Sequence, residues 1–248
     1  MYTICIVAII AALMFGCEKL FPGRHWPRVS GWWGRAIALN AAQIGSVFLA
    51  GLAWDRWMPG KSLWSLENQS VHWQVLIGYL VVTFIYYWWH RIRHDSQLLW
   101  RWFHQVHHSP QRIEIITSFY KHPNEILGNG VLSSAILYLL CGVSLEAAGI
   151  IVLITGLAEL FYHWNVKTPY CLGFFFQRPE SHCVHHELGK HRNNYSDLPL
   201  WDMIFGTFYN PTEAQFQCGF EQDRELKLGT MLAGTDVNQA PTTPVEDV

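Results

Sequence analysis

Five long apolar runs divide the chain, and each is close to the roughly 20 residues that a helix needs to cross a bilayer. The runs cover residues 2–17, 36–54, 72–89, 126–144 and 147–165. The last two runs lie so close together that they predict a tight helical hairpin. We therefore expect an all-α fold, a multi-pass membrane helical bundle of about four to five spans.

The composition supports insertion into a membrane. Half of the 248 residues are apolar and only 15% are charged, compared with about 25% in soluble domains. Many of the thirteen tryptophans lie near the ends of the apolar runs, which is typical of side chains at a membrane interface. The start of the chain lacks a basic segment, so we expect residues 2–17 to form a retained helix rather than a signal sequence cleaved near Cys17.

Nine of the thirteen histidines lie in three short clusters, at 90–94, 104–108 and 182–186, and at one further position. Residues four apart share a face of a helix, so we expect the imidazoles of each cluster to reach a single point. Imidazole ligates iron, zinc, copper and nickel, and nine rings are enough for two metal ions with positions left open. The predicted metal ligands are His90, His94, His104, His107, His108, His163, His182, His185 and His186.

The residues between the first two clusters continue the helical periodicity. We expect the third apolar helix to extend or bend beyond the membrane and to carry both clusters until Ser109 and Pro110 end it. The dimetal site would then lie in a cap outside the bilayer. His25 and His72 stand alone and are expected to be ordinary histidines, and Cys183 is expected to turn away from the ligand face.

Basic residues after the first apolar run set the expected orientation. Lys19, Arg24, Arg28 and Arg35 follow that run, and such residues favour the cytoplasmic side. Alternation of the spans then places every histidine cluster and the carboxyl end in the cytoplasm. We expect a multi-pass integral membrane protein with its site in a cytosolic cap, in the inner membrane of a bacterium or the endoplasmic reticulum of a eukaryote.

The motifs HRIRH, HQVHH and HCVHH resemble the HxxxH, HxxHH and HxxHH set of the fatty acid hydroxylase and sterol desaturase superfamily, which contains integral membrane di-iron enzymes. The segments KHPNE, FYHWNVKTP and NNYSDLPLWDMIFGTF extend the similarity to roughly residues 75–210. The resemblance implies N-terminal transmembrane helices and loops at 1–70 and a catalytic domain at 71–212. A cytosolic, partly disordered tail would follow at 213–248.

The resemblance also implies a function. Two iron ions, which zinc can replace on purification, would use O2 as co-substrate to hydroxylate or desaturate a C–H bond of a lipid. The sequence carries no flavin or nicotinamide fingerprint and no fused cytochrome b5 motif. We therefore expect the two electrons to come from an external protein of the cytochrome b5, ferredoxin or reductase type.

Two further residues are candidates for a catalytic role. Glu159 stands four residues before His163, where some members of the superfamily have a histidine, so it is expected to ligate a metal or to hold a ligand imidazole. The resemblance places His122, in the segment KHPNE, at the site or beside it.

Other functions remain open at this stage. A zinc-dependent membrane hydrolase needs three ligands and a general base, and a non-catalytic metal-binding membrane protein needs no turnover. A haem protein would place single histidines in mid-bilayer, and a transporter would place its ligands near the midplane. The net charge of -2 gives no indication of a nucleic-acid partner. The lipid substrate and the choice between hydroxylation, desaturation and ether cleavage are not fixed by the sequence.

Overall fold

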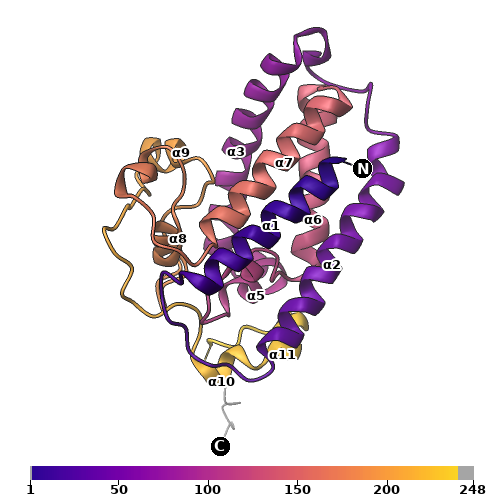
Figure 1. The fold of residues 1–248 in the computed structure, drawn as a ribbon. Helices are drawn as coiled ribbons and strands as arrows, with labels where there is room; N and C mark the ends of the chain where they lie inside the picture. Colours follow the sequence, from indigo (N-terminus) through magenta and orange to yellow (C-terminus); the bar gives the residue numbers. More distant parts are fainter. Residues whose placement is uncertain (1, 240–248) are drawn as a thin grey trace, which may run out of the picture.

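The computed structural model describes residues 2–239, and within them the fold is helical (Figure 1). The α-helices are α1 (Tyr2–Leu20), α2 (Trp32–Leu52), α3 (Val71–Asp95), α4 (Gln97–Leu99), α5 (Gln105–His108), α6 (Pro123–Ser134), α7 (Leu145–Tyr162), α8 (Pro179–His185), α9 (Pro199–Ile204), α10 (Gln222–Glu225) and α11 (Leu228–Leu232). Short 3-10 turns are η1 (Trp54–Arg56), η2 (Leu66–Asn68), η4 (Ile115–Thr117) and η6 (Tyr170–Phe174), and π-helical segments are η3 (Trp100–His104) and η5 (Ala135–Cys141). Within this part of the chain, β pairing is limited to an isolated bridge between Glu187 and Cys218.

The long helices run up and down in an elongated bundle (Figure 1). The connections 53–70 and 142–144 lie at one end of the bundle, and the segments 21–31, 96–122 and 163–239 gather at the opposite end or beside it. All three histidine clusters therefore fall at the same end of the bundle. This agrees with the expectation that they share one side.

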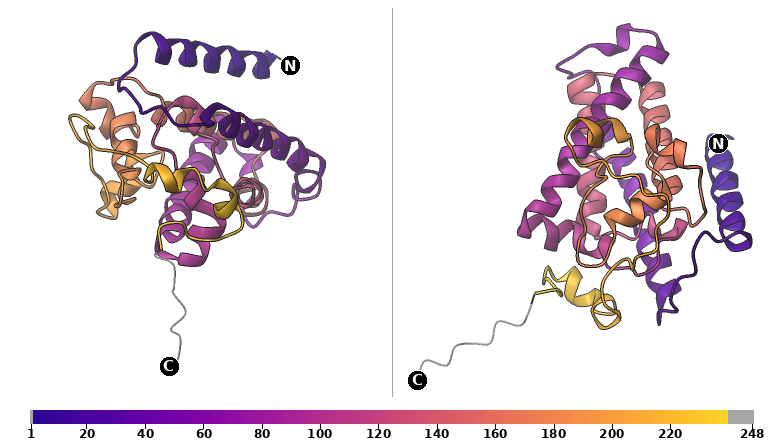
Figure 2. Two further views of the ribbon diagram at one scale, coloured as in Figure 1. Left: turned by 90° about the horizontal axis from the view of Figure 1, so that it is seen from below. Right: turned by 90° about the vertical axis from the view of Figure 1, so that its left-hand side faces the viewer.

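Three helical segments of the described residues are long and apolar enough to cross a membrane: Val71–Asp95, Pro123–Cys141 and Leu145–Tyr162. The other two predicted spans also form helices, α1 and α2. Helix α1 runs along the outside of the bundle (Figure 2), and α2 exposes apolar side chains such as Ile37 and Ile44. The prediction of an all-helical membrane bundle is thus confirmed.

The predicted hairpin at 126–165 is formed by α6, η5 and α7. Gly142 provides the sharp reversal with a positive φ of 61°, and the Ser144 side chain accepts a hydrogen bond from Ala147 N to cap α7. Helix α7 packs closely on α3, because Gly78 leaves room for the Ile151 side chain. This packing creates an apolar core between the helices at the end away from the histidines.

The third apolar helix does not carry both of the first two histidine clusters. Helix α3 ends at Asp95, and Ser96 adopts an extended conformation with a φ of -103° and a ψ of 116°. The Ser96 side chain then accepts a hydrogen bond from Leu99 N and starts a new helical segment, α4, η3 and α5. Ser96 ends α3 because a serine side chain can cap a new helix instead of continuing the old one. The change of direction at Ser96 turns the second cluster back toward the first.

The carboxyl-terminal region packs more firmly than expected from the partly disordered tail predicted at 213–248. Helix α11 lies in this region, and Met231 is fully buried together with Phe220 against Trp32 and Tyr120. Two large apolar side chains in a polar segment are enough to anchor it to the cap. The remainder of the predicted disordered segment, 240–248, lies outside the described residues.

Candidate metal centre

The nine predicted ligands come together in two neighbouring groups, and in each group the ligand atoms all lie within 4.8 Å of one another. Group A consists of His90, His94, His104, His108 and His185. Group B consists of His107, His163, His182 and His186. The two groups meet where the rings of His108 and His186 stack, with centroids 4.2 Å apart.

The expectation that each cluster reaches a single point is wrong for the second and third clusters. His104 and His108 belong to group A, whereas His107 between them belongs to group B. The third cluster divides in the opposite way, because His182 and His186 join group B and His185 joins group A. The cause is helix geometry: residues four apart differ by about 40° around the axis, but neighbours differ by about 100° and point to different sites.

The ligand imidazoles are almost completely shielded from solvent. Seven of the nine are buried, and His90 and His94 are half-buried. Burial lowers the pKa of His163 and of His185 to about 3, since charging an imidazole without water is unfavourable. These rings are therefore neutral at physiological pH, which is the form that binds a metal ion.

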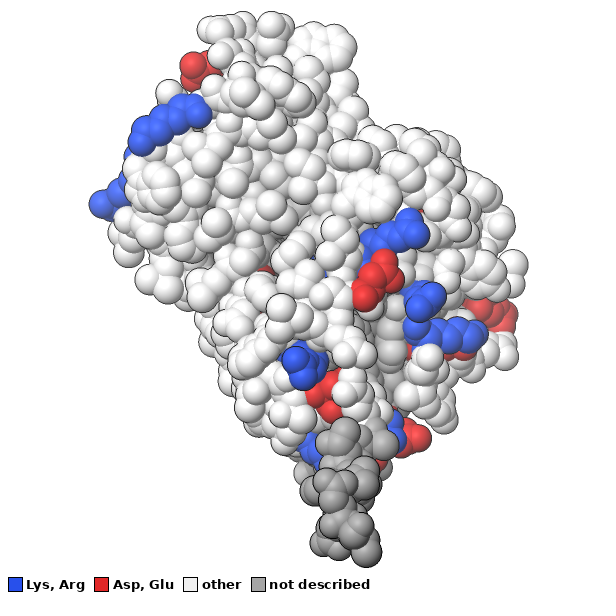
Figure 3. Space-filling view, turned by 180° about the vertical axis from the view of Figure 1, so that it is seen from behind, with Lys and Arg blue, Asp and Glu red and all other residues white. Residues whose placement is uncertain are grey.

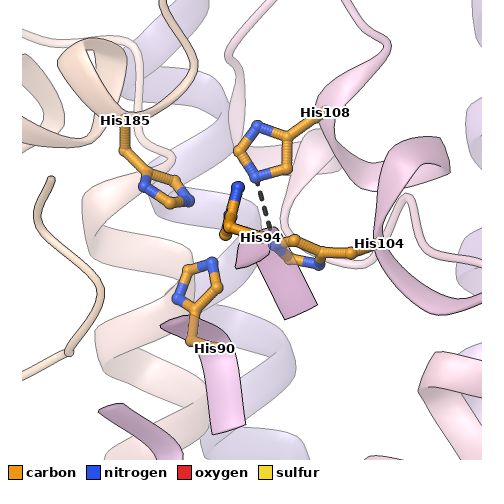
Figure 4. Close-up of side chains that lie close together, drawn as sticks. All are labelled: His90, His94, His104, His108 and His185. Atoms are coloured by element: carbon orange, nitrogen blue, oxygen red, sulfur yellow. Dashed lines mark hydrogen bonds between the residues drawn. The ribbon is translucent and has the colours of Figure 1, made fainter. Parts of the chain in front are cut away.

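Three of the inward-facing nitrogen atoms of group A lack hydrogen-bond partners from the protein. In group A, the Nε2 atoms of His90, His94 and His185 are buried and unpaired, and the rings of all five members converge (Figure 4). The remaining two members of the group, His104 and His108, bring their Nε2 atoms to 3.1 Å. Orphaned buried nitrogens are costly, and a metal ion between them would satisfy several at once. The donor set therefore fits a metal of the kind that imidazole prefers.

Four of the ligand rings place the other ring nitrogen, Nδ1, against a backbone carbonyl oxygen. The pairs are His90 with Tyr195 (2.7 Å), His107 with Tyr120 (3.3 Å), His163 with Glu159 (2.9 Å) and His185 with Asn193 (2.7 Å). A carbonyl oxygen can only accept, so Nδ1 carries the proton and Nε2 keeps its lone pair for a metal. Such partners fix the tautomer and the ring orientation of metal-binding histidines.

One loop, residues 191–195, contacts three of the five rings of group A. In addition to the carbonyl groups of Asn193 and Tyr195, the Nδ1 atom of His191 lies 3.1 Å from Nδ1 of His108. Burial lowers the pKa of His191 to about 4, so its ring is neutral and can accept the His108 N–H. This single loop therefore orients one ligand from each of α3, α5 and α8.

The backbone of the 191–195 loop is strained. His191, Asn193 and Asn194 have positive φ values of 46°, 69° and 51°, a conformation that side chains other than glycine rarely adopt. Strain of this kind persists where surrounding contacts impose it, commonly at functional sites. His191 was not among the site residues predicted from the sequence. The signal for this loop was the adjacent pair Asn193 and Asn194, because asparagine tolerates a positive φ better than most residues.

A carboxylate supports group A from the opposite side. Glu125 Oε1 lies 3.1 Å from Nδ1 of His104 and forms a salt bridge with Arg93. All three side chains are buried. A carboxylate behind a ligand imidazole raises its basicity and holds its orientation, and Arg93 balances the buried negative charge.

Glu159 and His122 lie outside both groups. The Glu159 carboxylate forms a salt bridge with Lys121, and only its backbone carbonyl contacts a ligand ring, that of His163. His122 caps α6 by accepting a hydrogen bond from Asn124 N at 3.0 Å. A catalytic role for either side chain remains a prediction. His25, His72 and Cys183 also lie outside the groups, as expected.

Known proteins resemble the part of the chain that carries groups A and B. A family model described as fatty acid hydroxylase matches residues 75–207, which is more than half of the chain. The ornithine lipid hydroxylase OlsE of Rhizobium tropici is 35% identical over 144 residues, which cover 56% of this chain and 42% of that protein. The very-long-chain aldehyde decarbonylase GL1-9 of Oryza sativa subsp. indica is 30% identical over 138 residues, which cover 54% of each chain.

The chain spans about half the length of these curated relatives. No solved structure matches it. The family model covers the segment from α3 to α9 that supplies all nine histidines, and with that coverage the chain belongs to the fatty acid hydroxylase family.

Proposed function

We propose that the protein is a membrane-bound di-iron oxygenase that hydroxylates a C–H bond of a lipid. The overall reaction would combine the lipid, one O2, two electrons and two protons to give the alcohol and water. The observation that carries this proposal is the pair of adjacent imidazole groups, with five and four members, and the three unpaired Nε2 atoms that face the centre of group A. The site residues are the nine histidines of groups A and B.

The proposal of iron rather than zinc rests on the donor set and the family. Structural zinc sites are closed with four ligands, and catalytic zinc sites pair three ligands with a general base. Here the grouped ligands are all imidazoles, and the nearest carboxylate, Glu125, is engaged by Arg93 and His104. Two iron ions bound in the groups would supply O2 activation and the oxidising power for attack on an unactivated C–H bond.

The protein's own residues would bind, orient and shield. Burial keeps the imidazoles neutral and excludes water from the centre, and the carbonyl partners hold the rings in place. Helix α7 ends at Tyr162, directly before the group B member His163. A lipid could therefore present its acyl chain from the bilayer with the head group at the surface. The names of the relatives, an ornithine lipid hydroxylase and an aldehyde decarbonylase, favour a lipid substrate.

Two further parts of the proposal concern the surroundings of the site. The centre would face the cytoplasm, as the basic residues at 19–35 predict. Because neither a flavin nor a nicotinamide motif occurs in the sequence, an external cytochrome b5, ferredoxin or reductase would deliver the electrons.

The test compares lipids from cells that express the wild type, His107→Ala or His72→Ala. His72 is exposed and outside both groups, so this matched control should keep a product that is one oxygen heavier than its substrate. His107→Ala should abolish the product while the protein remains in the membrane. Iron analysis of anaerobically loaded protein should give about two ions per chain. A single zinc ion with hydrolysis products would overturn the proposal.

A further inference from the structure

A patch of exposed apolar side chains covers one side of the cap, formed by η6 and α9, which contact each other. Three consecutive phenylalanines belong to it, and none of the residues that form its outer surface is charged. The exposed residues of this η6–α9 patch are Tyr170, Phe174, Phe175, Phe176, Leu200, Met203, Ile204 and Tyr209. Contiguous apolar surfaces of this kind mark a binding site for a protein or a membrane.

The patch is attached to the middle of a membrane-spanning helix. Trp201 of α9 donates a hydrogen bond from Nε1 to Thr83 Oγ1 at 2.9 Å and packs on Phe84 with ring centroids 5.1 Å apart. Phe205, just after α9, packs on Tyr87 and Trp88 with centroids at 5.1 and 4.9 Å. Figure 1 accordingly shows α9 beside α3, above the level of α5 and α10.

The position of Thr83 fixes the depth of α9. Helix α3 has 25 residues and is about 37 Å long at 1.5 Å per residue, with Thr83 at its midpoint. If a helix of this length crosses a hydrocarbon core of about 30 Å, its midpoint lies at least about 10 Å inside either edge. A tilt of α3 leaves the midpoint of the helix near the centre of the hydrocarbon core. A segment whose side chain touches Thr83 is therefore level with the lipid chains.

The length of helix α7 gives the same depth for α9 in the membrane. Its 18 residues give a length of only about 27 Å, so nearly the whole helix is needed to cross the core. The edge of the core then lies close to Tyr162, at the level of the metal centre. Contacts with α3 that extend from Trp88 up to Thr83 lie on the membrane side of this edge.

The charged side chain of α9 is hydrogen-bonded within the protein. Asp202, the charged residue of α9, is buried, and its carboxylate accepts hydrogen bonds from Tyr195 N, Ser196 N and Thr207 Oγ1 at 2.7 to 3.0 Å. Unsatisfied polar groups are costly in lipid, and this segment keeps its one carboxylate away from its apolar surface. On the face shown in Figure 3, charged side chains lie at the upper left, on the right at mid-height and toward the lower end, and the surface between these groups is almost free of charge.

We propose that the η6–α9 patch inserts into the bilayer beside α3, in contact with lipid acyl chains, without crossing the membrane. Its continuity with the lipid-facing surface of α3 selects lipid over a soluble partner. Aromatic and aliphatic side chains on a short in-plane segment are suited to the boundary of head groups and acyl chains. The cap would thus be partly embedded in the bilayer on its α9 side, instead of lying wholly outside the membrane.

The test places the photoreactive residue p-benzoylphenylalanine at single positions of the full-length protein in its native membrane. Phe175 and Ile204 report on the two elements of the patch, and both side chains are exposed, which leaves room for the added benzoyl group. Leu76, exposed on α3, is the lipid-contact control. Lys190, on the cap and with a side chain that is 67% exposed, is the control for water contact.

After irradiation, mass spectrometry should find lipid adducts at 175 and 204 with a yield within about twofold of that at 76, as expected for side chains equally immersed, and only background at 190. Adducts to another protein at 175 and 204, or background yields there while position 76 reacts, would overturn the proposal. The readout needs neither iron nor turnover. Failure of the oxygenase proposal therefore leaves this result unchanged, and the reverse also holds.

Discussion

Replacing His191 should weaken one of the two proposed metal sites selectively. In the folded protein its Nδ1 accepts the N–H of His108 at 3.1 Å, while its ring packs between Trp100 and Phe220 with centroids 5.7 and 5.5 Å away. His191→Phe keeps an aromatic ring in this place but removes the acceptor. The His108 ring then loses the partner that fixes its tautomer.

The size of the effect follows from how many of the five group A rings His191 supports. Removing a partner behind a ligand typically costs 10- to 100-fold in metal affinity, or about 1.4 to 2.7 kcal/mol. His191 orients one ring, that of His108, and the carbonyl groups of Asn193 and Tyr195 continue to hold two others. We therefore expect about tenfold weaker binding at group A and no change at group B, because the hydrogen bonds from the 191–195 loop to ligand rings all go to group A.

The assay is an anaerobic titration of metal-free protein with cobalt(II), whose visible spectrum reports ligand geometry, followed by metal analysis after dialysis. The matched control is His191→Asn, because Asn Oδ1 occupies the place of His Nδ1 and asparagine tolerates the φ of 46°. This variant should bind like the wild type. Equal losses of affinity in both variants would refute the acceptor role, as would tenfold weaker binding at both groups.

Three further results are expected. Glu159→Gln should leave the metal content unchanged, because only the Glu159 backbone reaches group B. In thermal unfolding it should lower stability by on the order of 1–3 kcal/mol, because Lys121 loses its ion-pair partner. Loss of metal would instead make the carboxylate a ligand. Gly219→Ala should destabilise the fold by more than about 1 kcal/mol in chemical denaturation, because the new Cβ would overlap the Pro110 carbonyl at a φ of 78°. Gly189 has the same φ but open space around it, so Gly189→Ala should cost less. Equal costs for the two variants would contradict the clash with Pro110. Burial holds the pKa of His163 at about 3, so below pH 6.5 the unfolded chain binds more protons than the folded one. Thermal scans of the metal-free protein should therefore show stability falling as the pH is lowered from about 6.5 to 5, by roughly 1.4 kcal/mol per pH unit for each such imidazole. A stability that does not change with pH would contradict neutral rings.

The sequence contained the main features of the fold because apolar length and histidine spacing are local signals. Runs of about 20 apolar residues predict helices, and α1, α2, α3, α6 with η5, and α7 appear where those runs lie. The identity of all nine grouped imidazoles was also predictable. Eight of them are concentrated in three short segments, and such a concentration has few explanations other than a metal.

The division of those imidazoles between two groups was not predictable in the same way. It depends on the rotation of α5 and α8 relative to each other, and so on the break at Ser96 and the π-helical segment η3. The supporting contacts are harder still to foresee, since most come from backbone carbonyls, which every residue has. His191 acts through a side chain, but a loop with three left-handed residues places it, and tertiary contacts decide that conformation.

The shortness of α7 gives the thickness of the bilayer a direct connection to the metal centre. A span of 18 residues that ends immediately before His163 has no spare turn to absorb hydrophobic mismatch. In a thicker membrane this end of the helix would be drawn inward, and in a thinner one it would tilt, and either adjustment would shift one imidazole relative to the other eight. The acyl-chain length of the host lipids would then tune the geometry of the site, so that the membrane would act on the protein both as solvent and as a mechanical constraint.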